Sequence, residues 1–262
     1  ALGLHALQHR GQEAAGIVSY DAESGQFFNE RCVGLVRDTF TSKSVIARLP
    51  GANAVGHNRY STAGAKGITA MRDVQPIFVE FEPGGCAIAH NGNITNAAVL
   101  KRDLVQRGSI FQSSSDTECI THLMARSMQR GIVERMKDAL RAVEGAFSIV
   151  AMTRTKMIGV RDPRGVRPLV LGKFGGAMVL SSETCALDII GADYVREIEP
   201  GEMVVITKNG VDSIRPFRPQ KSRFCIFEHV YFSRPDSIIG GQSVYETRRQ
   251  IGVELARENP VE

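Results

Sequence analysis

The stretch Gly56-His-Asn-Arg-Tyr-Ser-Thr-Ala-Gly64 joins a strand to a glycine-bearing loop. Residues 52–60 have the composition of a strand, and residues 61–67 have the glycine and small polar residues of a loop. The strand would carry Arg59 to the mouth of this loop. A guanidinium held there can bind a carboxylate through two hydrogen bonds, and the loop can close over a substrate. An arginine at an exposed strand end explains the stretch equally well.

A second segment, Ala89-His-Asn-Gly-Asn93, follows the short apolar strand that we expect at residues 86–90. Here Asn91 offers a side-chain amide, and Gly92 allows its own backbone N–H to approach a ligand closely. A side-chain amide and a backbone amide together can form an oxyanion hole. Taken alone, the segment is better explained as a turn, because Asn-Gly is a preferred dipeptide of tight turns.

A third segment, Ser113-Ser-Ser-Asp-Thr-Glu118, leads into a helix expected over residues 116–130. Asp116 could bind a substrate ammonium, although capping of the helix explains this segment better on its own. The three segments indicate more together than apart. An arginine for a carboxylate, an aspartate for an ammonium and paired amides for a developing oxyanion suit an α-amino acid that carries an acyl group. Glutamine fits this description.

The composition excludes several classes of protein. The net charge is only +4, tryptophan is absent, and no run of five basic residues occurs, which argues against nucleic-acid binding. The five cysteines are far apart and form no C-x-x-C pair. We therefore expect reduced thiols in a cytoplasm-like compartment, and neither a disulfide framework nor a zinc ribbon. No apolar run approaches the ~18 residues that a membrane span needs.

Hydrophobic periodicity predicts an α+β protein in which helices pack on stacked sheets. The expected helices cover residues 1–9, 96–107, 116–130, 133–143 and 244–257. The expected strands cover residues 14–19, 26–36, 52–60, 86–90, 148–153, 157–161, 169–173, 177–181, 203–207 and 224–232. Residues 215–222 hold two prolines and three cations and are typical of an exposed connector. This connector predicts a domain over residues 1–222 and the start of another over residues 223–262.

The motifs GHNRYSTAG, AHNGN and SSSDTE, in this order, resemble the glutamine-binding motifs of class II glutamine amidotransferases. The resemblance implies the N-terminal-nucleophile hydrolase fold, a four-layer αββα sandwich. It also implies that an N-terminal cysteine attacks the glutamine amide, with its own α-amino group as the base. By the same resemblance, Arg59 holds the glutamine carboxylate, Asp116 holds the ammonium, and Asn91 with the backbone of Gly92 forms the oxyanion hole.

Four further segments are similar to the phosphoribosylpyrophosphate amidotransferases within this class. They are residues 7–17, 161–169, 182–187 and 226–237. This similarity implies that ammonia passes to a phosphoribosyltransferase domain and converts phosphoribosylpyrophosphate to phosphoribosylamine, the first step of purine biosynthesis. It also implies Mg²⁺ in that second domain, a homodimer or homotetramer, and a cytoplasmic location, or a plastid in a plant. The alternatives are another class II amidotransferase, making glucosamine 6-phosphate or asparagine, and a non-catalytic protein that keeps the pocket.

The chain departs from the family pattern at both ends. In the family the nucleophile lies on a first strand that would precede Ala1, and the phosphate-binding loop of the second domain would follow Glu262. Cys225 has a further alternative, because some members of the family hold a 4Fe-4S cluster through a cysteine at this point, although a buried free thiol is favoured. No cysteine in the chain stands at a terminus, where its own α-amine could act as a base. These cysteines are Cys32, Cys86, Cys119, Cys185 and Cys225.

The histidines are better explained by structural roles than by chemistry. His5 and His9 have the spacing of a zinc pair on a helix, but no third ligand accompanies them, so packing and capping are favoured. His57 and His90 flank the candidate site and are expected to make supporting hydrogen bonds. His122 is expected on a helix face.

The 262-residue chain alone should release no ammonia from glutamine, because none of its cysteines has a free α-amine to activate the thiol. The measurement is ammonia production by the purified chain in the presence of glutamine. Ammonia above the level of a buffer blank would contradict this expectation.

Overall fold

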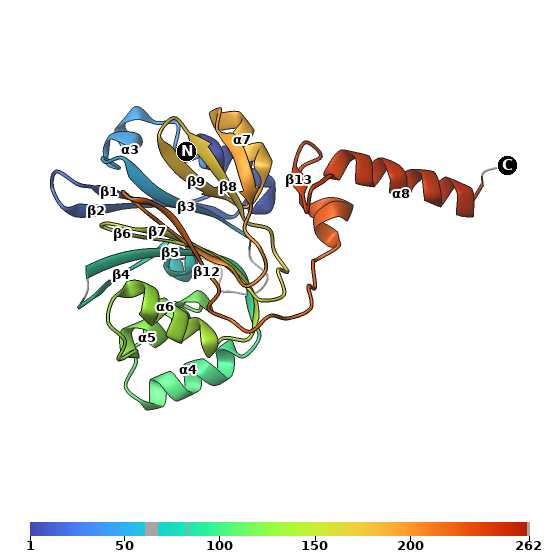
Figure 1. Ribbon diagram of the computed structural model, residues 1–262. Helices are drawn as coiled ribbons and strands as arrows, with labels where there is room; N and C mark the ends of the chain where they lie inside the picture. The colour runs from blue at the N-terminus through green and yellow to red at the C-terminus, as the bar shows by residue number, and fades with distance from the viewer. Residues whose placement is uncertain (61–67, 83, 261–262) are drawn as a thin grey trace.

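The computed structural model describes residues 1–60, 68–82 and 84–260, which form helices packed on stacked antiparallel sheets (Figure 1). The helical elements are α1 Leu2–Ala6, η1 Gln8–Arg10, α2 Val36–Thr39, α3 Lys43–Ala47, η2 Ile68–Asp73, α4 Ala97–Gln106, α5 Thr117–Arg126, α6 Ile132–Arg141, α7 Thr184–Ile190, η3 Glu228–Phe232 and α8 Val244–Glu258. The strands are β1 Ala14–Asp21, β2 Gln26–Val33, β3 Asn53–Arg59, β4 Ile77–Phe81, β5 Gly84–Ile94, β6 Gly145–Thr153, β7 Met157–Arg161, β8 Val170–Phe174, β9 Ala177–Ser181, β10 Asp193–Glu197, β11 Met203–Thr207, β12 Gly210–Ile214, β13 Ile238–Ile239 and β14 Gln242–Ser243.

The strands form a six-stranded sheet, two three-stranded sheets and a two-stranded ribbon. The six-stranded sheet has the order β12-β11-β7-β6-β5-β4, and the smaller sheets have the orders β2-β1-β3 and β10-β8-β9. The ribbon β13-β14 precedes α8, which extends away from the layered body in Figure 1.

The strand β5, which lies next to the edge strand β4 of the six-stranded sheet, explains the layering, because both of its faces are buried. Cys86 and Ile88 belong to the cluster formed with α5 and α6. The intervening Ala87 and Ala89 belong to the cluster formed with β1 and β3. Successive side chains of a strand point to opposite faces, so an apolar run of this length is buried between two layers. The small alanines allow the sheets to approach closely.

Further clusters complete the four layers. Leu171 of β8 and Leu180 of β9 pack against Val204 of β11, which places the sheet β10-β8-β9 on the same face of the six-stranded sheet as β2-β1-β3. On the outer side, Leu187 of α7 packs on Val170 of β8. The order is therefore helices α4 to α6, the six-stranded sheet, the two three-stranded sheets, and α1 with α7. This is the expected αββα arrangement.

Two sequence predictions about local structure are wrong. Residues 224–232, expected as a strand, contain the helical turn η3 instead, because this turn buries Glu228 and His229 on its inner side. Asn91-Gly92 forms no turn: β5 continues to Ile94, with Asn91 opposite Ser148 and Gly92 opposite Phe147 of β6. A Cβ at Gly92 would lie 2.1 Å from the backbone oxygen of Ala146, so the close pairing requires glycine.

The two three-stranded sheets leave a slot between them. In the described part of the chain, β3 pairs with β1 alone and β9 pairs with β8 alone, so each has an open edge. A cavity of about 180 Å³ lies between these edges. Its walls include Gly56 and His57 of β3, Val179 and Leu180 of β9, and Leu4 of α1. The slot has the position and the open strand edges that an additional strand would need.

Truncation of Ile149 to alanine should lower the free energy of unfolding by about 2–5 kcal/mol, because this fully buried side chain joins β6 to the cluster under α5 and α6. Ile251→Ala, on the exposed side of α8, is the matched control and should change it by less than about 0.5 kcal/mol. Urea denaturation followed by circular dichroism measures both. Equal effects of the two substitutions would contradict the assignment of the core.

Candidate functional site

The four residues singled out in the sequence line one cavity of about 570 Å³. Arg59 comes from the end of β3, Asn91 and Gly92 from β5, and Asp116 from the residue before α5. These residues are up to 57 positions apart in the chain, and only the pairing and layering of these elements bring them together. The loop at residues 61–67, which was expected to close over a substrate, lies outside the described residues.

Arg59 is held in place at the edge of the cavity. Its residue is only 9% exposed, and its Nη2 donates to Oδ2 of Asp73 at 3.2 Å. A guanidinium has five N–H donors in a planar fork. The pairing with Asp73 therefore leaves donors on Arg59 for a ligand carboxylate.

Asp116 does not cap α5 through its side chain. Its Oδ2 instead accepts the backbone N–H of Ile94 at 2.8 Å, which ties it to the end of β5. Its Oδ1 has a weaker contact, 3.5 Å from Oγ1 of Thr117. The side chain is 27% exposed, so one carboxylate oxygen remains available to a cation in the cavity.

Three buried polar atoms, in residues that line the cavity, have no hydrogen-bond partner among the described residues. They are Nδ2 of Asn91, Nδ1 of His57 and Oδ1 of Asn58. A buried polar group without a partner carries a desolvation cost of about 1–3 kcal/mol, so such groups are rare unless a ligand or water satisfies them. Asn91 thus offers an amide donor and His57 an acceptor, whereas Asn58 is turned to the opposite face of β3, where its Nδ2 donates to the carbonyl oxygen of Leu4.

The histidines of the site are neutral supports. Burial lowers the pKa of His57 to about 4, and burial also lowers the pKa of His90. The ring Nε2 of His57 lies 3.2 Å from the carbonyl oxygen of His90, so Nε2 carries the proton and Nδ1 is an acceptor. His90 in turn has Nδ1 3.0 Å from Oγ1 of Thr117, at the start of α5.

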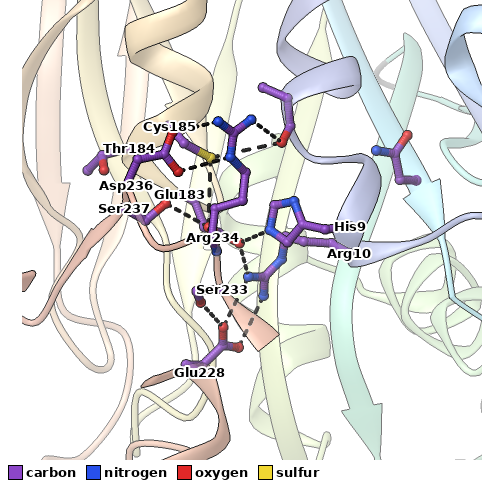
Figure 2. Close-up of polar contacts among 12 residues, drawn as sticks. His9, Arg10, Glu183, Thr184, Cys185, Glu228, Ser233, Arg234, Asp236 and Ser237 are labelled. Carbon is purple, nitrogen blue, oxygen red and sulfur yellow. Dashed lines mark hydrogen bonds and ion pairs between the residues drawn. The ribbon is translucent and has the colours of Figure 1, made fainter. Parts of the chain in front are cut away.

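A buried ionic network adjoins the cavity through His9 and Arg10, and the sequence did not reveal it (Figure 2). Glu183, just before α7, accepts hydrogen bonds from His9, Arg10, Ser237 and the backbone N–H of Arg234. His9 lies in η1, so the spacing of His5 and His9 does not make a metal pair on one helix.

Glu228 of η3 forms the second half of this network. It binds Arg10 at 3.0 and 3.1 Å, Arg167 at 2.8 Å and Ser233 at 2.6 Å. The guanidinium carbon of Arg10 lies over the ring of Phe232, 4.5 Å from the centroid of that ring. The only sequence signal for these contacts was a single acidic residue within the apolar run 224–232.

Cys225 also lines the cavity and is half-buried, with Sγ 3.9 Å from Nη1 of Arg167. Within the described ranges, no three His, Cys, Asp or Glu side chains gather in a way that could hold a metal ion. Cys225 therefore has no co-ligands in this part of the chain. The same ranges contain no helix with the length and apolar character needed to cross a bilayer.

Comparison with known proteins identifies the protein family to which the chain belongs. Residues 57–188 match the family described as the glutamine amidotransferase domain, which covers half of the chain, and the chain belongs to this family. Within it, the chain is similar to amidophosphoribosyltransferases over its whole length. It is 54% identical to that of Rhizobium etli and 49% identical to amidophosphoribosyltransferase 1 of Arabidopsis thaliana, a chloroplastic protein.

A solved structure gives the same result. The chain aligns over 100% of its length, with a TM-score of 0.92 and 43% identity, to the glutamine phosphoribosylpyrophosphate amidotransferase of B. subtilis complexed with ADP and GMP, and covers 55% of that chain. It covers 53% of the R. etli protein and 45% of the A. thaliana protein. The chain thus spans about half the length of the relatives that it matches.

The free energy of unfolding should fall as the pH drops from about 5 to about 2, because the buried carboxylate of Glu183 is protonated in this range. Burial alone would raise the pKa of Glu183, but the hydrogen bond from His9 and the charge of Arg10 outweigh it and lower the pKa to about 2. A carboxylate whose pKa is depressed in the folded state stabilises that state above its unfolded pKa and loses this contribution as the pH falls through the folded value.

Denaturant melts between pH 7 and pH 2 measure this dependence, and Glu183→Gln should give a flatter profile than the wild type. Glu254→Gln, an exposed substitution on α8, is the control and should keep the wild-type profile. An unchanged profile in Glu183→Gln would contradict the role given to this carboxylate.

Proposed function

We propose that this chain is the glutamine-hydrolysing part of an amidophosphoribosyltransferase. The observation that carries the proposal is the convergence of Arg59, Asn91, Gly92 and Asp116 on one cavity. A primary carboxamide has one acceptor oxygen and one donor NH₂ group. The unpartnered donor of Asn91 and the unpartnered acceptor of His57 are complementary to these two groups.

Glutamine recognition would depend on two charges at the edge of the cavity. Arg59 binds the α-carboxylate with the donors that Asp73 leaves unused, and Asp116 binds the α-ammonium with its less engaged oxygen Oδ1. Charge-assisted hydrogen bonds of this kind are about twice as strong as neutral ones and fix the orientation of the ligand. The side-chain amide of glutamine then extends toward Asn91.

The oxyanion hole would consist of the Asn91 side chain and the Gly92 backbone N–H. Donors aimed at the charge that develops in the transition state stabilise it without reorganisation, and the loss of one such donor typically lowers kcat by about 10²–10³. The continuous pairing of β5 with β6 supports this role, because it fixes the backbone at both residues.

The nucleophile would come from a strand seated in the slot between β3 and β9, whose walls include His57, His90 and Asn91. The cysteines inside the chain are poor candidates. Burial raises the pKa of Cys86 to about 12 and the pKa values of Cys119 and Cys185 to about 11, which disfavours the reactive thiolate. A terminal cysteine on the added strand would supply both the thiol and the α-amine that activates it.

The complete protein would pass the released ammonia to a second domain that converts phosphoribosylpyrophosphate to phosphoribosylamine. The similarity of the whole given chain to amidophosphoribosyltransferases supports this reaction. The exposed connector at residues 215–222 then separates the glutaminase domain, residues 1–222, from the start of the phosphoribosyltransferase domain, residues 223–262. Mg²⁺, a homo-oligomeric state and a cytoplasmic or plastid location belong to the same proposal. A 4Fe-4S cluster at Cys225 would take its further ligands from outside the described residues.

In the full-length protein, Arg59→Ala should raise the KM for glutamine by about tenfold or more, since the loss of a charged hydrogen bond costs roughly 1.5–3 kcal/mol. Asn91→Ala should instead lower kcat for glutamine by about 10². Steady-state glutaminase assays measure both effects.

Phosphoribosylamine formation from free ammonia is the control for these two variants and should change by less than about twofold, because ammonia bypasses the glutamine cavity. Equal losses with glutamine and with ammonia would mean that these residues serve the fold. A wild-type protein that hydrolyses no glutamine would contradict the proposed function, and would favour a non-catalytic role for the cavity.

A further inference from the structure

Asp73 is a buried carboxylate that lines the cavity and is hydrogen-bonded to both Arg59 and Ser114. It stands at the end of η2, and its side chain is only 4% exposed. Its Oδ2 accepts from Nη2 of Arg59 at 3.2 Å and from Oγ of Ser114 at 2.6 Å. Its Oδ1 accepts the backbone N–H of Ser114 at 2.7 Å. Three of the roughly four acceptor positions of this carboxylate are therefore occupied by the protein itself.

These contacts connect the two charged ends of the proposed amino-acid site. Arg59 is the proposed carboxylate ligand, and Ser114 lies two residues before Asp116, the proposed ammonium ligand. Ser114 donates two hydrogen bonds to Asp73, one from its backbone N–H and one from its hydroxyl. These bonds fix both the side chain of Ser114 and the backbone of the loop before α5. A single buried carboxylate thus sets the position of the guanidinium relative to the loop that carries Asp116.

Asp73 can hold this spacing because its own segment is braced. Two residues later, the side chain of Gln75 accepts the backbone N–H of His90 at 2.7 Å and contacts the carbonyl oxygen of His90 at 3.4 Å. Val74 between them is fully buried. A Cβ at Gly16 of β1 would lie 2.3 Å from the backbone oxygen of Gln75, so β1 packs directly against this segment. The segment is therefore fixed to β5 immediately before Asn91.

We propose that Asp73 is the positioning residue that determines specificity for α-amino acids in this cavity, by fixing the spacing between Arg59 and Asp116. The inference rests on the proposed glutamine-binding function. Asp73 itself takes no part in binding the ammonium, because three of its roughly four acceptor positions are already occupied, whereas Oδ1 of Asp116 has among the described residues a long hydrogen bond from Thr117 at 3.5 Å and lies 3.9 Å from Nδ1 of His90. Loss of the Asp73 charge would release the guanidinium while leaving the oxyanion donors in place.

The test compares two substrates in the full-length protein. Glutamine carries both α-charges, whereas 4-aminobutanamide has the same carboxamide and amine without the α-carboxylate. Asp73→Asn should raise the KM for glutamine by about tenfold and change kcat by less than about twofold. Its kcat/KM for 4-aminobutanamide should stay within about twofold of the wild-type value, so the preference for glutamine should fall by about tenfold.

Two further variants separate positioning from folding. Ser114→Ala keeps the pairing of Asp73 with Arg59 and removes the hydroxyl contact alone, and it should reduce the preference for glutamine by about threefold. Asp103→Asn removes an exposed carboxylate of α4 that pairs with Arg107, and it should leave the preference unchanged. Activity with free ammonia and the thermal melting temperature report on the fold of each variant.

The outcomes are distinguishable. A wild-type protein without glutamine hydrolysis overturns the proposed function and this inference with it. An active wild type, together with an unchanged preference in Asp73→Asn or in Ser114→Ala, overturns the inference alone. Equal losses with glutamine and with 4-aminobutanamide in Asp73→Asn also overturn it, because a purely structural role would affect both substrates alike.

Discussion

The pairing of β5 with β6 is the constraint on which the rest of the molecule depends. It runs without a break from Cys86 to Ile94 and sends alternate side chains of β5 into two separate clusters. The same register carries Asn91 and Gly92 past the end of the apolar run and into the cavity. Gln75 hydrogen-bonds to β5 at His90, and Asp116 hydrogen-bonds to it at Ile94. The core and the cavity are therefore aligned by one ladder of backbone hydrogen bonds.

The buried ionic network beside the cavity depends on paired charges and not on backbone pairing. Arg10, Glu183 and Glu228 are almost completely buried, and burial of charges is costly unless each is paired and hydrogen-bonded. Every carboxylate here has at least three partners, including Ser237 and Ser233. The network adds little net stability against an apolar replacement, but the loss of one member would leave its partner unpaired. It therefore fixes the segment after the connector in one arrangement against η1 and α7.

The sequence predicts the parts of this structure that depend on local pattern or on a motif. Strands such as 203–207 and helices such as 244–257 agree with the structure because their periodicity and flanking residues are distinctive. The apolar run 224–232 gave the wrong element, since a short apolar run does not distinguish a strand from a buried helical turn. The motifs indicated Arg59, Asn91, Gly92 and Asp116. Asp73, however, pairs with residues 14 and 41 positions away, and Glu183 pairs with Arg234, 51 positions away, and no local pattern encodes such partners.

The slot between β3 and β9 also bears on how the proposed nucleophile would be held. A strand seated there would form backbone hydrogen bonds on both sides and would merge the two three-stranded sheets into one continuous sheet. Chain ends are usually poorly ordered unless secondary structure ties them down. A terminal cysteine on this strand would therefore be held in one position by the same hydrogen bonds that complete the sheet.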